Sequence, residues 1–206
     1  MSPRGRRVAA GRAARLRLRR GLATALRGAD LLERKLRLLL DREHTARRAA
    51  EDARRVWEEK LADAETWLLR GVLLGGERAL VEAAPADRAH VDIRWAALMG
   101  VRHPAAVEYA APVRSPAEPT PSNTALAHAE TAYRAAVRAA AELATRQAAA
   151  ELLAAEAERT RRRVRALRRH WIPRLQAELA TVELGLEEAE HEEAVRRRWG
   201  ATRTDR

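Results

Sequence analysis

The sequence predicts an all-α, elongated fold, in which both ends of the chain form a long antiparallel two-helix coiled coil, with a short β-hairpin and a Pro-rich linker in the middle. Three observations predict it. First, 47 of the 206 residues are Ala and only 7 are aromatic; Ala has the highest helix propensity but buries little area, which favours slender helices. Second, six of the eight prolines lie within residues 85–121. Third, apolar residues recur with heptad spacing on both sides of that stretch.

The prolines divide the chain into three predicted parts. Residues 1–70 form an N-terminal coiled-coil helix, because they contain heptad spacing and no proline after Pro3. Residues 71–121 form the middle region, and Gly71 with Gly75-Gly76 supplies plausible stop signals for the first helix. Residues 122–206 form the C-terminal coiled-coil helix.

The first helix carries an apolar stripe with a mean period of 3.5 residues, the spacing of a left-handed coiled coil. We call the apolar stripes along which the helices pack the seam. Its predicted members in this helix are Leu18, Leu22, Ala25, Ala29, Leu32, Leu36 and Leu39.

The last helix begins after Ser122 or Asn123, both favourable N-cap residues. This helix also carries an apolar stripe, whose members in its later part are Leu153, Ala157, Thr160, Val164, Leu167, Trp171, Leu175 and Leu179. The last three of these are separated by consecutive fours, which locally relaxes or reverses the supercoil. Pro173 lies at this irregularity and is expected to bend the helix or loosen one turn.

The sequence of the middle region predicts a β-hairpin followed by an extended segment. Val91, Ile93 and Trp95 alternate with polar residues, as in a half-buried strand, and a second strand follows Met99-Gly100. Residues 111–121 contain four prolines and are expected to form an extended or mobile linker.

Charge distribution favours an antiparallel pairing of the two helices. Residues 1–29 contain nine Arg and no acidic residue, whereas Glu187, Glu188, Glu190, Glu192 and Glu193 cluster near the other end. An antiparallel hairpin brings these regions together. Because exposed ion pairs contribute only about 0–1 kcal/mol each, this supports orientation more than stability.

The sequence contains no recognisable catalytic, cofactor or metal site. Cys is absent, which excludes disulfides, thiolate zinc sites and cysteine nucleophiles. His191-Glu192-Glu193-Ala194-Val195 lacks the second His of a zinc-protease motif, and Gly75-Gly76-Glu77-Arg78 lacks the Lys-Ser/Thr of a phosphate loop. We therefore expect a chain that is not an enzyme by itself and binds no nucleotide.

Membrane insertion and secretion are also not expected. The longest run without charge is Pro119–Ala129, and a membrane span needs about 20 apolar residues. Arginines interrupt the start of the sequence before any apolar stretch long enough for a signal peptide. A cytoplasmic location fits these features.

A net charge of +11 leaves nucleic-acid binding as the main alternative. The stretch from Arg4 to Arg20 and the run from Arg159 to Arg169 could contact phosphates, although such arginines are also typical of the charged face of a helix. Acidic residues are interspersed along most of both helices, aromatic stacking groups are few, and no nucleic-acid motif is present. A coiled coil with a purely structural role is the third interpretation.

Five motifs in order carry a resemblance to a known family: Arg15-Leu-Arg-Leu-Arg-Arg20, Arg27-Gly-Ala-Asp-Leu-Leu32 with Lys35, Met99-Gly-Val-Arg-His-Pro104, Thr160-Arg-Arg-Arg-Val-Arg-Ala-Leu167, and Ile172-Pro-Arg-Leu175 before an acidic helix. In this order and spacing the chain resembles the D subunit of the V-type and archaeal or bacterial A-type rotary ATPases. Glu33 departs from the pattern, because the family commonly has a basic residue there.

The resemblance implies a central rotor stalk that transmits torque between an ion-driven membrane ring and a catalytic ring during ATP synthesis or ATP-driven ion transport. Its implied partners are the A and B subunits of the catalytic ring, the small F subunit, and the socket component of the membrane rotor ring. The resemblance also implies that the chain is part of a peripheral complex on the cytoplasmic face of the membrane and that it does not bind nucleic acid.

Two sets of residues become candidate contacts on this basis. The candidate interface with the catalytic ring comprises Arg15, Arg19, Arg20, Arg161, Arg162 and Arg163. The candidate modulatory hairpin comprises Met99, Gly100, Val101 and Pro104, for which a role as a structural spacer is an equal alternative.

Overall fold

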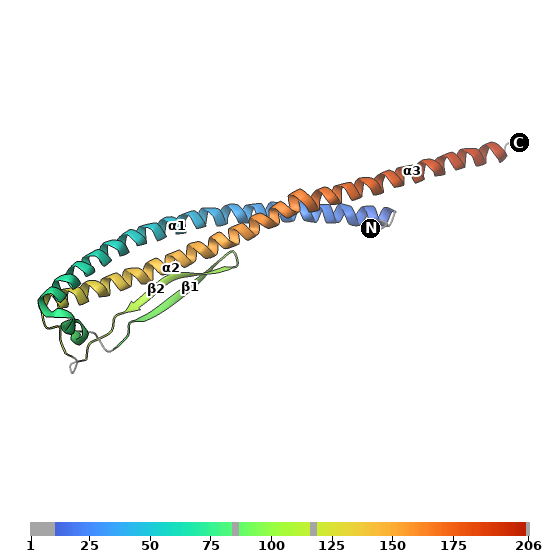
Figure 1. Ribbon diagram of the computed structural model, residues 1–206. Coiled ribbons are helices and arrows are strands. Elements are labelled where there is room, and N and C mark those ends of the chain that lie inside the picture. Colours follow the sequence, from blue (N-terminus) through green and yellow to red (C-terminus); the bar gives the residue numbers. More distant parts are fainter. Residues whose placement is uncertain (1–10, 84–86, 116–118, 205–206) are drawn as a thin grey trace, which may run out of the picture. The chain divides into compact units, whose positions relative to one another are not determined.

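The computed structural model describes residues 11–83, 87–115 and 119–204. Figure 1 shows helix α1 (Arg12–Ala83), strands β1 (His90–Leu98) and β2 (Val101–Ala110), and helix α2 (Thr124–Ala166). A π-helical turn, η1 (Leu167–Trp171), follows and leads into helix α3 (Ile172–Thr204). The predicted all-α class is confirmed, with long helices at both ends of the sequence and a two-stranded hairpin between them.

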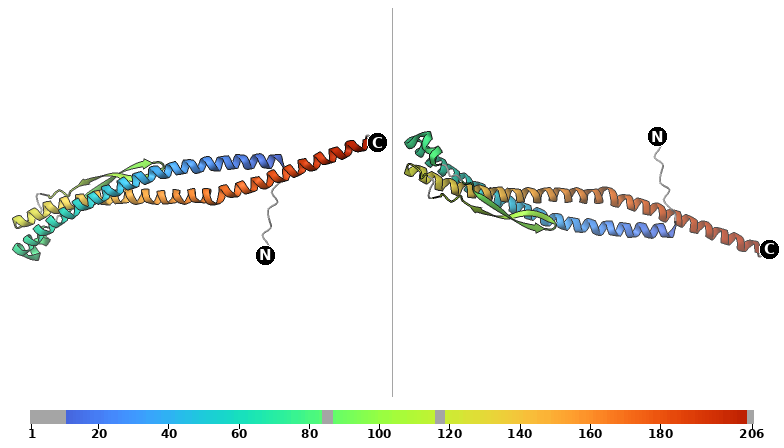
Figure 2. Two further views of the ribbon diagram at one scale, coloured as in Figure 1. Left: turned by 90° about the horizontal axis from the view of Figure 1, so that it is seen from above. Right: turned by 90° about the horizontal axis from the view of Figure 1, so that it is seen from below.

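The chain divides into two compact units. The end unit combines the chain up to Leu36 with the chain from Arg159 onward, and the middle unit is Arg37–Glu158. Within each unit a part of α1 lies beside a part of the C-terminal helices, in Figure 1 and in both views of Figure 2.

In the end unit the two helices are antiparallel. Arg12 pairs with Glu190, and Arg19 pairs with Glu183 at 2.6 Å. As the residue number rises along α1, the number of its partner falls along α3, which is the orientation that the charge distribution predicted. A buried cluster of Ala25, Ala29, Ile172 and Leu175 lies between the helices, with Leu18, Leu22, Leu26 and Leu167 packed against it.

Burial follows the predicted stripe of α1 in both units. Ala25, Ala29 and Leu39 are buried, and Leu18, Leu22, Leu32 and Leu36 are partly buried. On the opposite helix Leu175 is buried, whereas Val164, Leu167 and Leu179 are partly buried.

The prediction is wrong for one member of the stripe, Trp171. Trp171 is 50% exposed, and its neighbour Ile172 is buried instead. The physical reason is the π-helical turn, in which the backbone N–H of Ile172 donates to the carbonyl of Leu167, five residues earlier. An α-helix would place residue 171 on the stripe; the wider turn places residue 172 there.

The predicted end of the first helix at Arg70 is also wrong, because α1 continues to Ala83. The helix is kinked at Gly76, whose φ of 73° and ψ of 175° are non-helical, so two helical segments meet there. The stop signal predicted at Gly75-Gly76 therefore marks a real break. Gly71 and Gly75 lie within the helix where another side chain approaches closely. A Cβ on Gly71 would lie 2.6 Å from Cδ2 of Leu126, and one on Gly75 would lie 2.9 Å from Nδ2 of Asn123. Gly71 and Gly75 thus permit close packing, whereas Gly76 allows the positive φ at the kink.

Asn123 joins the two helices of the middle unit. Its side-chain Oδ1 accepts a hydrogen bond from the backbone N–H of Leu126 at 2.9 Å, the geometry of an N-cap. Its Nδ2 donates to the carbonyl of Gly71 at 3.2 Å. Of the two N-cap residues that the sequence offered, Asn123 therefore holds this position, immediately before the first residue of α2.

The hairpin belongs to the middle unit, where Figure 1 shows it alongside α2. Its strands pair in antiparallel register from His90 opposite Ala110 to Leu98 opposite Val101. Met99 and Gly100 connect them with φ of 51° and 83°, the left-handed values of a type I′ turn. The register shifts once, where Trp95 pairs with Pro104, and a proline without an N–H is tolerated at such a bulge.

Candidate functional site

The described residues contain no group of three or more His, Asp or Glu side chains arranged to hold a metal ion. None of the helices in these residues has an apolar stretch suited to crossing a membrane.

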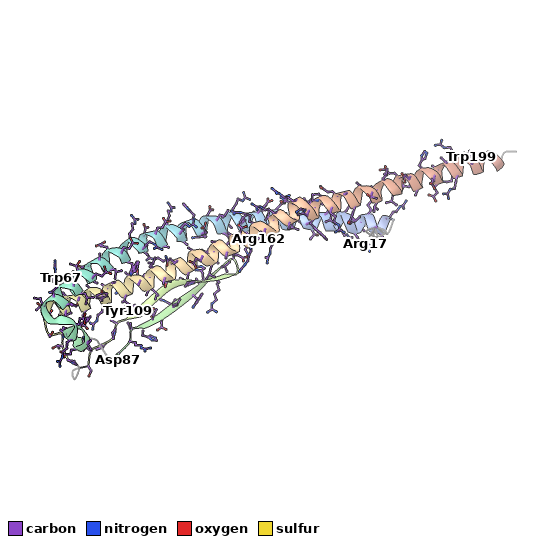
Figure 3. The ribbon with its side chains drawn as sticks, in the orientation of Figure 1. Arg17, Trp67, Asp87, Tyr109, Arg162 and Trp199 are labelled. Atoms are coloured by element: carbon purple, nitrogen blue, oxygen red, sulfur yellow. The ribbon has the colours of Figure 1, made fainter. Side chains whose placement is uncertain are left out.

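The arginine-rich surface of the end unit comes from the N-terminal part of α1 and the last turns of α2, and Figure 3 labels Arg17 and Arg162 on it. The candidate ring-contact residues differ from one another in exposure. Arg20, Arg162 and Arg163 are exposed, whereas Arg15 and Arg161 are partly buried. Arg19 is exposed but is held by Glu183, whose carboxylate accepts hydrogen bonds from Nε at 3.1 Å and Nη2 at 2.6 Å.

Arg168 forms the principal ionic cluster of the end unit, a role that no motif in the sequence indicated. Its Nε donates to Glu33 at 2.8 Å, and its Nη2 donates to Asp30 at 2.5 Å and to Glu33 at 3.2 Å. The hydrogen bond to Glu33 raises the pKa of Arg168 above its ordinary value, with a smaller contribution from the Asp30 charge.

This cluster explains why an acidic residue at position 33 suits this chain. Asp30 and Glu33 are three residues apart and lie on one face of α1, so a single guanidinium can contact both carboxylates. The spacing of Asp30 and Glu33 on one helix face is visible in the sequence and could have indicated a site for a basic side chain. The partner of this acidic pair was not visible, because several arginines lie close to Arg168 and the helical register was unknown.

A second ionic cluster holds the proline-rich segment against α2 in the middle unit. Arg114 donates to the carbonyl of Pro119 at 2.6 Å and to the carboxylate of Glu130 at 3.0 Å. Glu130 also accepts from Arg134. The predicted linker is thus attached to the helix at Arg114, although residues 116–118 of the segment lie outside the described residues.

An apolar groove of 670 Å³ lies beside this cluster in the middle unit. Tyr109, labelled in Figure 3, lines it from the hairpin, and Leu68 and Leu80 line it from α1. The other lining residues are Val81, Ala89, Pro112, Leu126, Ala129, Glu130, Tyr133, Arg134 and Val137.

Large apolar side chains are also exposed along the last part of α1. Leu73, Leu74 and Val81 are 78%, 73% and 77% exposed, respectively. Large apolar side chains exposed close together are uncommon on a helix that faces water. We call these three residues the apolar end of the middle unit.

The four candidate hairpin residues lie at and near its tip. Met99 and Gly100 form the turn, Val101 is partly buried at the start of β2, and Pro104 is buried. The Met99 side chain is 43% exposed. Trp95, also half-exposed, has the guanidinium of Arg102 5.0 Å from its ring centroid.

Comparison with known proteins identifies the family. A family model that describes the D subunit of ATP synthase matches residues 14–199, which include both units and the hairpin. No curated protein matches the chain at a significant level. The matched range contains all five of the motifs on which the resemblance to the rotary ATPases depended. The chain therefore belongs to the family of ATP synthase D subunits.

Proposed function

We propose that this chain is the rotor stalk that transmits torque between the ion-driven membrane ring and the catalytic ring of A and B subunits in a V/A-type rotary ATPase. Membership of the ATP synthase D-subunit family supports a stalk component of a rotary ATPase. The finer role includes binding of the F subunit and of the socket component, and attachment to the cytoplasmic face of the membrane.

The observation that carries the proposal is the construction of the end unit. Its two helices meet through Ala25 and Ala29 on one side and Ile172 and Leu175 on the other. Small side chains permit a close approach of two helices, within the usual range of about 8–10 Å between axes. Ion pairs at Glu183 and Glu190 connect the same two helices and support their antiparallel orientation.

Arginines on the outside of this helix pair suit a part that turns inside a ring. A single tight apolar contact would trap one angular position, whereas several exposed charges interact with acidic surfaces at many angles. Each exposed charge pair contributes about 0–1 kcal/mol, so no one pair dominates.

Neutralising one arginine is therefore expected to have a modest effect. Arg162→Gln should leave the complex with the A, B and F subunits intact and change ATP hydrolysis by less than about fivefold, the equivalent of 1 kcal/mol. Arg48→Gln, an exposed arginine of the middle unit, is the matched control. Loss of the complex from the single Arg162 change would contradict a distributed contact.

Co-purification of the full chain with its cognate A, B and F subunits tests the function as a whole. A defined complex that survives moderate salt supports the stalk. Recovery of nucleic acid alone, lost as salt increases, would support the arginine-rich nucleic-acid-binding alternative, because phosphate contacts are strongly salt-dependent.

The apolar end is proposed to contact the socket component of the rotor ring. Leu73→Ser with Leu74→Ser should weaken binding of that component at least tenfold, since each buried Leu contributes about 1.5–3 kcal/mol. Thermal unfolding should change little, because both side chains are already exposed. Leu31→Ser, 63% exposed in the end unit, is the control and should retain binding. Equal weakening by the control would contradict this assignment.

The hairpin is proposed to modulate hydrolysis, with the structural spacer as the alternative. Met99→Asn separates the two roles, because Asn at the first position of a type I′ turn preserves the backbone and removes the Met side chain. If Met99 contacts a partner, the hydrolysis rate of the assembled complex should change while assembly is retained. An unchanged rate would favour the spacer.

A further inference from the structure

The π-helical turn η1 inserts one extra residue into an otherwise regular helix. Its defining hydrogen bond runs from the N–H of Ile172 to the carbonyl of Leu167, a separation of five residues where an α-helix has four. Such turns are rare and occur mostly as single insertions within α-helices. This one separates α2 from α3 without interrupting the helical path.

Pro173 accounts for the position of the turn. Proline has no backbone N–H, and in a helix interior its ring collides with the carbonyl four residues earlier, here that of Arg169. The π turn lies immediately before Pro173, and its longer hydrogen-bond step of five residues widens the helix next to the proline ring.

The inserted residue decides which side chain packs between the helices. Before the turn, Thr160, Val164 and Leu167 are buried or partly buried at steps of four and three. After Leu167, an α-helix would next place Trp171 on this face, but the π turn places Ile172 there. Ile172 is 5% exposed and packs with Ala25 and Ala29, while Trp171 is 50% exposed.

The sequence also contains a second solution without an inserted turn. Leu175 and Leu179 follow Trp171 at steps of four, a spacing that a continuous α-helix accommodates by relaxing its supercoil. Leu175 belongs to the seam in both arrangements. The two arrangements thus differ at one position of the seam, which either Trp171 or Ile172 can occupy.

We propose that Pro173 is the residue that selects between these two arrangements, with the π turn holding Ile172 inside and Trp171 outside. Without Pro173 the helix becomes continuous, and Trp171 replaces Ile172 against Ala25 and Ala29. The residue at position 173 therefore decides whether Trp171 or Ile172 packs between the helices of the end unit.

The first test reports the environment of Trp171 in the full chain. The other tryptophans are changed to Phe, and Pro173 is compared with Pro173→Ala; the changed positions are Trp57, Trp67, Trp95 and Trp199. With Pro173 present, the single Trp should emit at a long wavelength and be readily quenched by acrylamide. In Pro173→Ala, the emission should shift to shorter wavelength and much of the quenching should be lost.

The second test uses cysteine cross-linking and leaves every Trp in place, since the natural chain contains no Cys. A short bis-maleimide should join Ala29→Cys to Ile172→Cys when Pro173 is present, and this product should be lost in Pro173→Ala. The pair Ala25→Cys and Leu175→Cys is the matched control, because both residues belong to the same buried cluster and the proposal keeps Leu175 in the seam in either arrangement. Its cross-linking should be unchanged.

Far-UV circular dichroism should show equal or higher helicity in Pro173→Ala, because Ala favours the helix by about 3 kcal/mol relative to Pro. Unchanged Trp emission together with retained cross-linking of positions 29 and 172 would overturn the proposal. A loss of helicity would also overturn it, since the proposal requires the variant to form a continuous helix.

Discussion

Leu39→Ala is expected to lower the free energy of unfolding of the middle unit by about 2–4 kcal/mol. Leu39 is fully buried, at 0% exposed, in a fold whose other buried positions are mostly Ala. Removing its side chain loses apolar burial and leaves a cavity, to the extent that the surrounding structure does not relax into the space. Urea unfolding followed by circular dichroism at 222 nm measures the change.

The adjacent residue supplies a matched control. Leu38 is 50% exposed on the same turn of α1, so Leu38→Ala removes the same atoms with little loss of burial. Its effect should be within about 0.5 kcal/mol of zero, as for an ordinary surface substitution. Equal effects of the two variants would show that Leu39 does not pack in the seam.

Gly71→Ala is expected to destabilise the middle unit by about 1–3 kcal/mol, the usual cost of overpacking, even though Ala is the better helix former. The added Cβ would lie 2.6 Å from Cδ2 and 2.7 Å from Cγ of Leu126, and 3.1 Å from the backbone N of the same residue. Leu126 is 3% exposed and cannot rotate away freely. The two helices must therefore separate locally, which also strains the hydrogen bond from Asn123 to the Gly71 carbonyl. The shift in urea midpoint measures the cost.

Gly28→Ala is the control for this prediction. Gly28 lies in the same helix, but a Cβ there meets no atom within 4 Å. Helix propensity alone then applies, and the variant should be more stable by up to about 1 kcal/mol. Stabilisation by both substitutions would mean that Gly71 is not a close-contact position.

Individual residues show how far the sequence could be interpreted. The heptad positions of α1 were predictable because helical periodicity is a local property: Ala25, Ala29 and Leu39 could be assigned to one face without knowledge of their partner. The N-cap was predictable for the same reason. Gly71 was misinterpreted as a stop signal, because glycine serves both helix ends and close approaches, and only the position of Leu126 distinguishes these uses.

The candidate contacts were predictable to a smaller extent. The arginine motifs and the turn at Met99-Gly100 were visible in the sequence, but the pairing of Arg19 with Glu183 was not. Which exposed charges pair with each other depends on the register in which the two helices lie side by side. In a sequence with many arginines and glutamates, register cannot be inferred from charge alone.

The sequence by itself determined that this protein has long helices at both ends, an antiparallel preference and a hairpin between them, because propensity, periodicity and turn chemistry act over a few neighbouring residues. Only the tertiary structure decided that Ile172 packs between the helices in place of Trp171, and that Arg168 binds Asp30 and Glu33. Both outcomes depend on the rotation of one helix against another. That rotation is set by the contacts made along the whole helix pair and by a single π turn, neither of which short-range patterns specify.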